Sequence, residues 1–409
     1  MLKKNEPMRN LTSTKCAKCG ACTVVCPIYQ KTGKESYTAR GRLHLFTLLK
    51  KNRSWAYGDI LSKCLLCGAC ADVCPRGIDV PSIIRKTRYD FPKLAGPLHF
   101  KKLLTTQILA SPHLLDSLGK LQKNLLSRIP RESGLRKLLP FPESTEGNTT
   151  TNSHSLSEYK NLPNAHVSYF TGCMALYLSP TISSSTIHLA EKATGNAPTI
   201  PSGQTCCGLA SYSSGNMDEA KKLARRNIRA FSDSLLPILT SCASCYTHLR
   251  SYPDLLADDP DWIEEAKDFA QRVREFSSFF LSRIDQLSFA QSTSPPRIFY
   301  HDPCHLRFGV KKIHTAPRRL ITVAAGSSPL ELPHGPRCCG QGGLFSLAHP
   351  TLSQQIQDPL LDEISELSAL QVVTTCSGCL MQLMEGAKKN AVPTQVQHLG
   401  ILLHELLEL

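Results

Sequence analysis

The sequence predicts a multidomain protein in which a helical, cysteine-rich N-terminal domain precedes two repeated α/β domains. Three observations carry this prediction: the grouping of the 18 cysteines, a polar segment at 142–162, and an internal repeat after that segment. With 409 residues, of which 41% are apolar, the chain is long enough to form more than one buried core.

Charge divides the chain as clearly as the cysteines do. Residues 1–140 carry 26 basic and 8 acidic side chains, a net charge of +18, whereas residues 141–409 carry a net charge of −4. A basic surface of this kind suits a membrane surface, an acidic protein or a nucleic acid. We expect no nucleic acid partner, because the basic segment has neither aromatic stacking platforms nor a base-reading motif.

Several classes of protein are excluded by missing patterns. No apolar run approaches the length of a membrane-spanning helix, and the N-terminus lacks the apolar core of a signal peptide. We therefore expect a cytoplasmic protein, either free or peripheral on the cytoplasmic face of the membrane, where disulfides explain the cysteines poorly. Standard nucleotide, flavin, zinc-protease and nucleophile-elbow motifs are also missing, which leaves metal ligation.

The N-terminal domain, expected at 1–95, carries two copies of C-x2-C-x2-C-x3-C-P. These are Cys16, Cys19, Cys22 and Cys26, then Cys64, Cys67, Cys70 and Cys74. This spacing is the bacterial ferredoxin pattern, which holds a 4Fe–4S cubane, and in two-cluster proteins the fourth cysteine ligates the other cluster. We therefore expect Cys74 to join the first three cysteines and Cys26 to join the second three. The alternative, two structural zinc sites, requires neither the third cysteine nor the proline.

The spacing between the motifs predicts an α-helical ferredoxin domain. The 37 residues between Cys26 and Cys64 exceed what a minimal ferredoxin needs, and residues 39–51 have a helical apolar pattern. Residues 96–141 are basic and Leu-rich, and their prolines predict short helices. The polar stretch at 142–162 predicts a flexible linker.

An internal repeat fills the rest of the chain and predicts α/β domains at 163–290 and 297–409. Segment 166–173 matches 297–304, 204–211 matches 336–343, and 238–245 matches 372–379. Apolar strands run into cysteines, and helical patterns at 218–236 and 352–370 lie between them. This alternation predicts mainly parallel sheets, in which ligands gather beyond the carboxyl ends of the strands.

Each repeat holds five cysteines: Cys173, Cys206, Cys207, Cys242 and Cys245, then Cys304, Cys338, Cys339, Cys376 and Cys379. Adjacent cysteines suit a multi-iron cluster better than a single tetrahedral ion. Gly208 and Gly340 after each pair allow close approach or a positive φ. We expect one further iron–sulfur cluster per repeat beside the two cubanes. The alternatives are one zinc ion per repeat, inert buried cysteines, or a redox dithiol at each C-x2-C.

Two other pairs of side chains have candidate roles. His301 and His305 flank Cys304, where they would either pass protons to a quinone or disulfide, or hydrogen-bond neighbouring loops. Arg40 and Arg42 would either dock a partner or form a solvated helix start.

The duplicated pattern C…CCG…C-x2-C resembles the cysteine-rich CCG domain of heterodisulfide reductase, whose repeats bind non-cubane 4Fe–4S clusters. Two ferredoxin motifs followed by two CCG repeats resemble the iron–sulfur subunit of glycolate oxidase. Related lactate-oxidising complexes and the electron-transfer subunit of anaerobic glycerol-3-phosphate dehydrogenase share this architecture. ARGRLHLF, at 39–46, is similar to a segment of the glycolate oxidase type.

This resemblance implies a multidomain fold with an N-terminal α-helical ferredoxin domain and two CCG domains. It further implies an electron-transfer subunit of a glycolate or lactate oxidoreductase. The chain would take electrons from a flavin-containing oxidase subunit and pass them to a quinone-type acceptor, with no catalytic residue of its own. Alternative functions are disulfide reduction at the CCG clusters, electron transfer for glycerol-3-phosphate dehydrogenase, and a scaffold without redox turnover.

Overall fold

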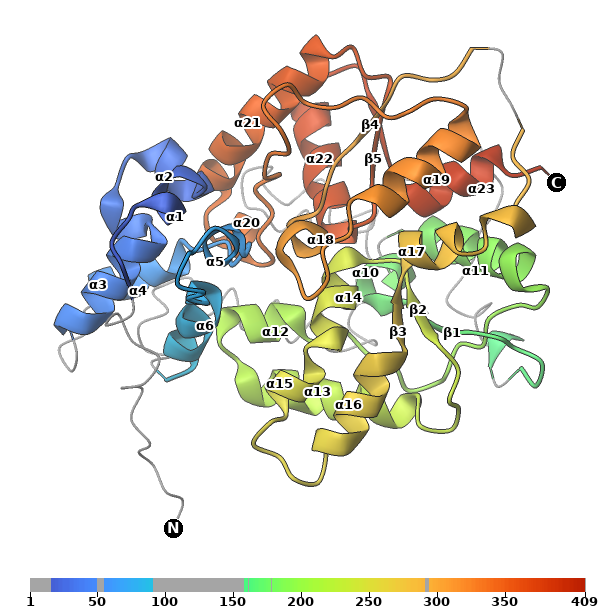
Figure 1. Cartoon of the computed structure of the whole chain (residues 1–409), viewed down its shortest axis with the longest axis horizontal. Helices are drawn as coiled ribbons and strands as arrows, with labels where there is room; N and C mark the ends of the chain where they lie inside the picture. Colours follow the sequence, from blue (N-terminus) through green and yellow to red (C-terminus); the bar gives the residue numbers. More distant parts are fainter. Residues whose placement is uncertain are drawn as a thin grey trace, which may run out of the picture.

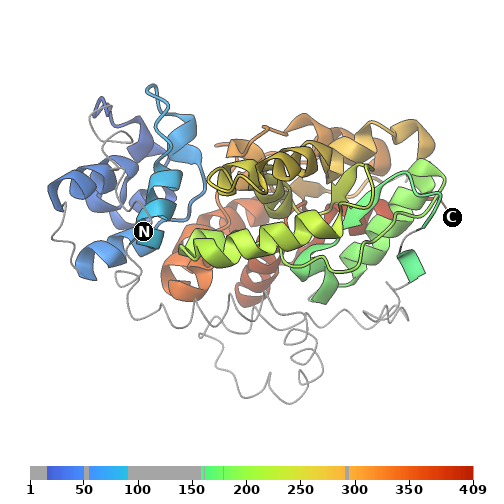
Figure 2. The ribbon, with the colours of Figure 1, turned by 90° about the horizontal axis from the view of Figure 1, so that it is seen from below.

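The computed structural model describes residues 16–49, 55–90, 158–160, 162–177, 179–290 and 294–408. The predicted basic helices at 96–141 lie outside these residues. So does the predicted linker at 142–162, apart from 158–160 and 162. The described parts form a helical N-terminal unit at one end of the molecule and two α/β repeats at the other, as Figures 1 and 2 show from two directions.

Short helices build the described part of the N-terminal unit around both cysteine motifs. They are α1 (Ala21–Val24), α2 (Pro27–Thr32), the 3-10 helix η3 (Glu35–Tyr37), α3 (Ala39–Leu49), α4 (Trp55–Ser62), α5 (Ala69–Asp72) and α6 (Val80–Asp90). Gly20 and Gly68 precede α1 and α5 with φ of 85° and 91°, which glycine adopts most easily. The helix predicted at 39–51 is confirmed as far as Leu49.

The first repeat contains a parallel three-stranded sheet in the order β1-β2-β3. Its elements are β1 (Ser168–Phe170), α10 (Gly172–Tyr177), α11 (Thr181–Thr194), α12 (Leu209–Ser214), α13 (Met217–Ala230), β2 (Ile238–Thr240), α14 (Ala243–Arg250), α15 (Tyr252–Leu255), α16 (Ile263–Arg272), β3 (Val273–Glu275), α17 (Phe276–Leu281) and η8 (Ile284–Gln286). Tyr169 lies opposite Leu239, which in turn lies opposite Arg274.

The second repeat has the same topology, with a parallel sheet in the order β4-β5-β6. Its elements are β4 (Ile298–Tyr300), α18 (Cys304–Phe308), α19 (Thr315–Ala325), α20 (Phe345–Ala348), α21 (Pro350–Glu366), β5 (Gln371–Thr374), α22 (Ser377–Lys389), β6 (Gln395–His398) and α23 (Leu399–Leu406). The parallel sheets predicted from the repeat are confirmed. The third strands, β3 and β6, were not predicted, because their three or four residues carry no alternating apolar pattern.

Two predicted helices end earlier than expected, so the predicted ends at 236 and 370 are wrong. Helix α13 stops at Ala230, and α21 stops at Glu366. In both cases an arginine binds the carbonyl groups that follow the helix. Arg272 donates to Phe231 and Ser234, and Arg297 donates to Leu367 and Ser368. These bonds satisfy carbonyls that a longer helix would have paired internally.

The two repeats pack face to face through equivalent elements. Helix α11 of the first repeat contacts α23 of the second, and α17 of the first contacts α19 of the second. Since α11 corresponds to α19 and α17 to α23, exchanging the repeats reproduces the same pair of contacts, as in an isologous dimer. The backbone N–H of Ala243 donates to the carbonyl of Thr375 across this interface at 2.9 Å. The carboxyl ends of β2 and β5 therefore meet.

The lengths and the hydropathy of the helices were compared with those of membrane-spanning helices. Within the described ranges, none of the helices combines the length and the apolar character that crossing a bilayer requires.

Candidate iron–sulfur centres

One buried cavity in the N-terminal unit collects cysteines from both motifs. Cys26 lines it together with Cys64, Cys67 and Cys70, as the cross-ligation hypothesis requires. Burial raises the pKa of Cys67 and of Cys70 above the ordinary range. Protonated thiols are thus favoured here until a cation compensates the thiolates. Four cysteine thiolates are the usual ligand set of a 4Fe–4S cluster. We name this the four-cysteine cavity.

Arg42 also lines the four-cysteine cavity, and only 3% of its surface is exposed. Its guanidinium donates to the carbonyls of Ile60 (3.2 Å) and Lys63 (3.0 Å). Both roles expected for Arg42, a docking residue and a solvated helix start, are therefore wrong. The apolar residues around it in α3 turn this face of the helix inward. Arg40 is partly exposed and pairs with Glu35 at 2.7 Å.

Of the other four cysteines of the two motifs, three are half-buried and one is exposed. Cys16, Cys22 and Cys74 pack against one apolar cluster that includes Leu43. Burial raises the pKa of Cys22, and the neighbouring Cys16 raises it further. Cys19 is exposed and lines neither the four-cysteine cavity nor the open pocket beside Cys16. The structure thus brings three of these four predicted ligands against one cluster and leaves Cys19 on the outside.

All ten cysteines of the two repeats line a single cavity, which we name the ten-cysteine cavity. They are Cys173, Cys206, Cys207, Cys242, Cys245, Cys304, Cys338, Cys339, Cys376 and Cys379. The cavity measures about 160 Å³, roughly ten times the space that one water molecule needs. It therefore has room for polynuclear groups, and its donors are soft thiolates, which prefer iron–sulfur clusters or zinc. The residues fit the predicted clusters.

Local backbone structure places these cysteines at the carboxyl ends of the strands. Cys242 and Cys376 follow β2 and β5 and precede α14 and α22. Gly208 and Gly340 follow the cysteine pairs with φ of 92° and 83°, so the predicted positive φ is confirmed. The backbone N–H of Gly340 donates to the Sγ of Cys338 at 3.3 Å, a bond of the kind that tunes cluster potentials.

Hydrogen bonds among the sulfur atoms favour a thiolate in several pairs. Cys173 donates to Cys206 over 3.7 Å, and this bond helps to hold the pKa of Cys206 well below its usual range. Hydrogen bonds from Cys245 and Cys376 do the same for the pKa of Cys242. Because Cys376 belongs to the second repeat, this contact joins the two five-cysteine sets.

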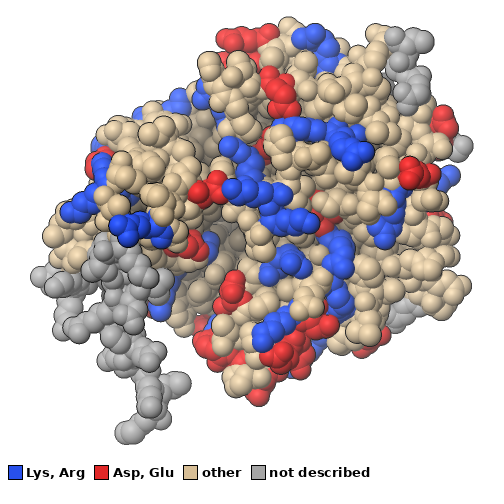
Figure 3. Space-filling model, in the orientation of Figure 1, with Lys and Arg blue, Asp and Glu red and all other residues tan. Residues whose placement is uncertain are grey.

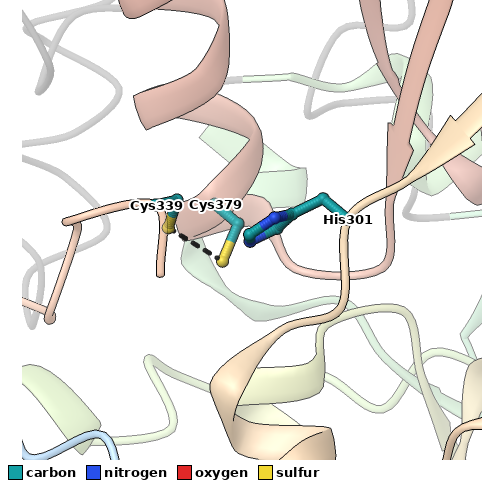
Figure 4. Close-up of side chains that lie close together, drawn as sticks. All are labelled: His301, Cys339 and Cys379. Carbon is teal, nitrogen blue, oxygen red and sulfur yellow. Dashed lines mark hydrogen bonds between the residues drawn. The ribbon is translucent and has the colours of Figure 1, made fainter. Parts of the chain in front are cut away.

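A second group of sulfur atoms lies deeper in the second repeat. The Sγ atoms of Cys339 and Cys379 are 3.4 Å apart. The imidazole of His301 points toward both, and its nearest nitrogen and the two sulfurs lie within 4.8 Å of one another (Figure 4). The hydrogen bond between Cys339 and Cys379 lowers the pKa of Cys339, and His301 contributes in the same direction. His305 lines the ten-cysteine cavity, where burial lowers its pKa.

The four-cysteine and ten-cysteine cavities adjoin at Cys67, which lines both. A negative charge on Cys304 raises the pKa of Cys67 further, and α18, which begins at Cys304, contacts α5. The contact is tight, because a Cβ on Gly68 would come within 2.9 Å of the Phe308 side chain. Lys312 and Asp72 form an ion pair across the same boundary at 2.5 Å.

Arg88 fixes the N-terminal unit against the first repeat. Its guanidinium donates to the carbonyls of Leu61 (2.6 Å) and Cys64 (3.0 Å), and to that of Ser213 in the first repeat (2.6 Å). Burial lowers the pKa of Arg88 to about 10. Arg88 was not predicted, because nothing in the local sequence distinguishes it from the other basic residues before 140. Ser244, whose Oγ lies 2.9 Å from the Sγ of Cys376, was not predicted either.

Comparisons with known proteins agree with this arrangement. Residues 12–78 match the 4Fe-4S dicluster domain, and residues 167–250 and 298–384 match the cysteine-rich domain named CCG. The probable glycolate oxidase iron-sulfur subunit of Bacillus subtilis (strain 168) is 28% identical over 95% of this chain and 93% of its own length. Lactate utilization protein A of Geobacillus thermodenitrificans is 31% identical over 58% of this chain and 98% of its own length.

The chain belongs to the iron–sulfur subunit family that contains these two relatives, the glycolate oxidase subunit and lactate utilization protein A. Its membership was predicted from the two cysteine motifs and the duplicated CCG pattern, and it is confirmed. Lactate utilization protein A of Bacillus subtilis, 30% identical over 98% of its length, is a further relative. Both matches to the cysteine-rich domain fall inside the repeats expected at 163–290 and 297–409.

Proposed function

We propose that this family member is the electron-transfer subunit of a 2-hydroxy-acid oxidoreductase that acts on glycolate or lactate. One observation carries the proposal: the cysteine sets lie next to one another in the fold. Cys16 and Cys22 are half-buried, and a negative charge on Cys22 acts on Cys70 of the four-cysteine cavity. Cys67 lines both that cavity and the ten-cysteine cavity. The names of the relatives supply the substrate class. A flavin-containing partner subunit would oxidise the hydroxy acid.

The residues of this chain would hold and insulate the redox groups. When bound, iron–sulfur clusters transfer one electron at a time. They can therefore carry the two electrons of a reduced flavin singly to a two-electron acceptor. Cys16, Cys19, Cys22 and Cys74 would hold the outer cubane, and Cys26, Cys64, Cys67 and Cys70 the inner one. Each five-cysteine set would hold one further cluster. Arg42 and Arg88 donate to the backbone carbonyls of Lys63 and Cys64, next to the inner thiolates.

The lining of the ten-cysteine cavity suits an apolar acceptor. Besides the cysteines, it consists mainly of side chains such as Met174, Leu209, Leu347 and Met381. A quinone-type acceptor matches this lining. Disulfide reduction is the second candidate, because both five-cysteine sets face one cavity and would act on one substrate from two sides.

The decisive experiment reconstitutes the anaerobically purified chain with the flavin-containing oxidase subunit from the same organism. Glycolate, D-lactate, L-lactate and glycerol 3-phosphate are then added separately, and bleaching of the visible iron–sulfur absorbance is followed. We expect glycolate or lactate to bleach it and a quinone analogue to restore it. Restoration by an organic disulfide alone would favour the second candidate. Stoichiometric zinc without iron would overturn both and leave a scaffold.

Cys64→Ser tests the order in which electrons pass through the sites. It should leave the outer cluster reducible by the substrate and its oxidase, while electrons no longer reach the ten-cysteine cavity. Full reduction of every centre in this variant would contradict the proposed order of the sites.

A further inference from the structure

The two repeats differ at one position next to the sulfur atoms. In the sequence match, His301 of the second repeat stands where Phe170 stands in the first, and each directly follows a buried tyrosine, Tyr300 or Tyr169. Phe170 is fully buried and packs against Phe231, with ring centroids 6.1 Å apart. An apolar ring needs no polar partner, whereas an imidazole in the same place does.

The Nε2 atom of His301 has no such partner among the described residues. Only 1% of the surface of His301 is exposed, and its Nε2 atom is buried without a hydrogen bond. The side chain leaves the loop after β4 and points toward the sulfur atoms of Cys339 and Cys379, as Figure 4 shows. A buried nitrogen without a hydrogen bond destabilises the fold, because the nitrogen has lost its contact with water and gained nothing in exchange. A ligand at this point would remove that cost.

His398 shows how a structural histidine looks in the same fold. It is also fully buried, but both its ring nitrogens have partners. Its Nε2 atom donates to the carbonyl of Ser241 at 2.8 Å, and its Nδ1 atom accepts from the N–H of Gly400 at 3.0 Å. The Nε2 atoms of His188 and His248 are also buried without a hydrogen bond. Among the described residues, however, His301 is the histidine that lies within 4.8 Å of two cysteine sulfur atoms in one group.

We propose that His301 is a nitrogen ligand of the second repeat's centre, which would therefore have mixed imidazole and thiolate ligation. The centre of the first repeat, with Phe170 at the matching position, would be ligated by thiolates alone. Imidazole nitrogen is a good ligand for iron, and it replaces thiolate in some iron–sulfur centres. The inference rests on the proposed function, because it requires iron in the second repeat.

The test uses the full-length chain, purified without oxygen after growth with ¹⁵N-labelled histidine. Pulsed electron paramagnetic resonance on the reduced protein should detect nitrogen coupling of the strength of a direct bond in one cluster signal. Labelling should convert this ¹⁴N pattern to that of ¹⁵N. Cluster signals with no histidine coupling, or with only the weak coupling of a hydrogen bond, would overturn the inference. The unmodified chain decides the question, so the test does not depend on a variant that folds.

Two substitutions then assign the nitrogen. His301→Phe, which introduces the residue of the first repeat, should abolish the coupling, and His301→Asn serves if the phenylalanine variant does not fold. His398→Gln, the matched buried control, should retain the coupling. Persistence of the coupling in both His301 variants would overturn the assignment. A chain without iron would defeat the proposed function as well, whereas iron bound by thiolates alone would defeat only this inference.

Discussion

The ligands of each cluster cannot be assigned from their order in the sequence, because cysteines of one motif line different sites. Cys26 belongs to the first motif, yet it lines the four-cysteine cavity with Cys64, Cys67 and Cys70. Cys26→Ser should therefore damage the inner cluster, and Cys74→Ser should damage the outer one. Iron content and cluster-specific electron paramagnetic resonance signals would measure both. A loss in Cys26→Ser that is confined to the cluster of Cys16, Cys19 and Cys22 would show that the pairing is wrong.

His398 should make the stability of the repeats sensitive to acid. Burial lowers its pKa to about 4, from an ordinary value of 6.5. Between these values the unfolded chain binds a proton that the folded chain does not, so the free energy of unfolding falls as the pH decreases. The slope from one such group is about 1.4 kcal/mol per pH unit.

The measurement compares denaturant unfolding of the unmodified chain and of His398→Gln at several pH values from 7 down to 5. The unmodified chain should lose stability more steeply, because the glutamine does not titrate. Parallel curves for the two proteins would contradict the assignment of this acid sensitivity to His398.

At the scale of elements, the loops after the cysteine pairs are equivalent in conformation but not in packing. A Cβ on Gly340 would lie 2.4 Å from the backbone oxygen of Ser353, whereas the nearest atom for Gly208 is 3.5 Å away. Gly208→Ala should therefore lower the free energy of unfolding by only about 1–2 kcal/mol, the cost of holding an alanine in the left-handed backbone conformation. Gly340→Ala must also displace α21, so it should destabilise the chain further and release iron from the second repeat. Equal effects of the two substitutions on unfolding and iron content would refute this difference.

Some elements of the fold could be predicted from the sequence alone, and others could not. Strands β1, β2, β4 and β5 were predictable because each is a short apolar run that ends near a cysteine. The meeting of ten cysteines in one cavity was not predictable. It depends on contacts such as the one between Ala243 and Thr375, which lie 132 residues apart in the chain. For the same reason the unpartnered nitrogen of His301 could be found only in the structure.

At the scale of the whole molecule, charge should control association with a partner. The described face in Figure 3 mixes basic and acidic side chains, whereas residues 1–140 carry the net charge of +18. Changing Lys101, Lys102, Lys120 and Lys123 to Glu should weaken binding to the flavoprotein or to anionic vesicles without loss of iron, although these residues lie outside the described ranges. The binding should also weaken as salt increases. Association that is the same at low and high salt would remove the electrostatic argument.

The arrangement of the whole chain also sets an order among the proposed centres. Helix α5, which follows Cys67, contacts α18, which begins at Cys304 of the second repeat, and the hydrogen bond from Cys376 to Cys242 then joins the second repeat to the first. Electrons should therefore pass from the inner cubane to the second repeat before they reach the first. Two double substitutions at equivalent positions test this order: Cys338→Ser with Cys339→Ser, and Cys206→Ser with Cys207→Ser.

Each pair should remove one cluster and lower the iron content from about 16 to about 12 atoms per chain. Loss of the second repeat's centre should leave the first repeat's centre oxidised when the hydroxy acid and the flavoprotein are added, although both cubanes are reduced. Loss of the first repeat's centre should leave the second still reducible. Reduction of the remaining centre at the same rate in both variants would mean that the inner cubane serves the two repeats in parallel. The contact between α5 and α18 would then not direct the path of the electrons.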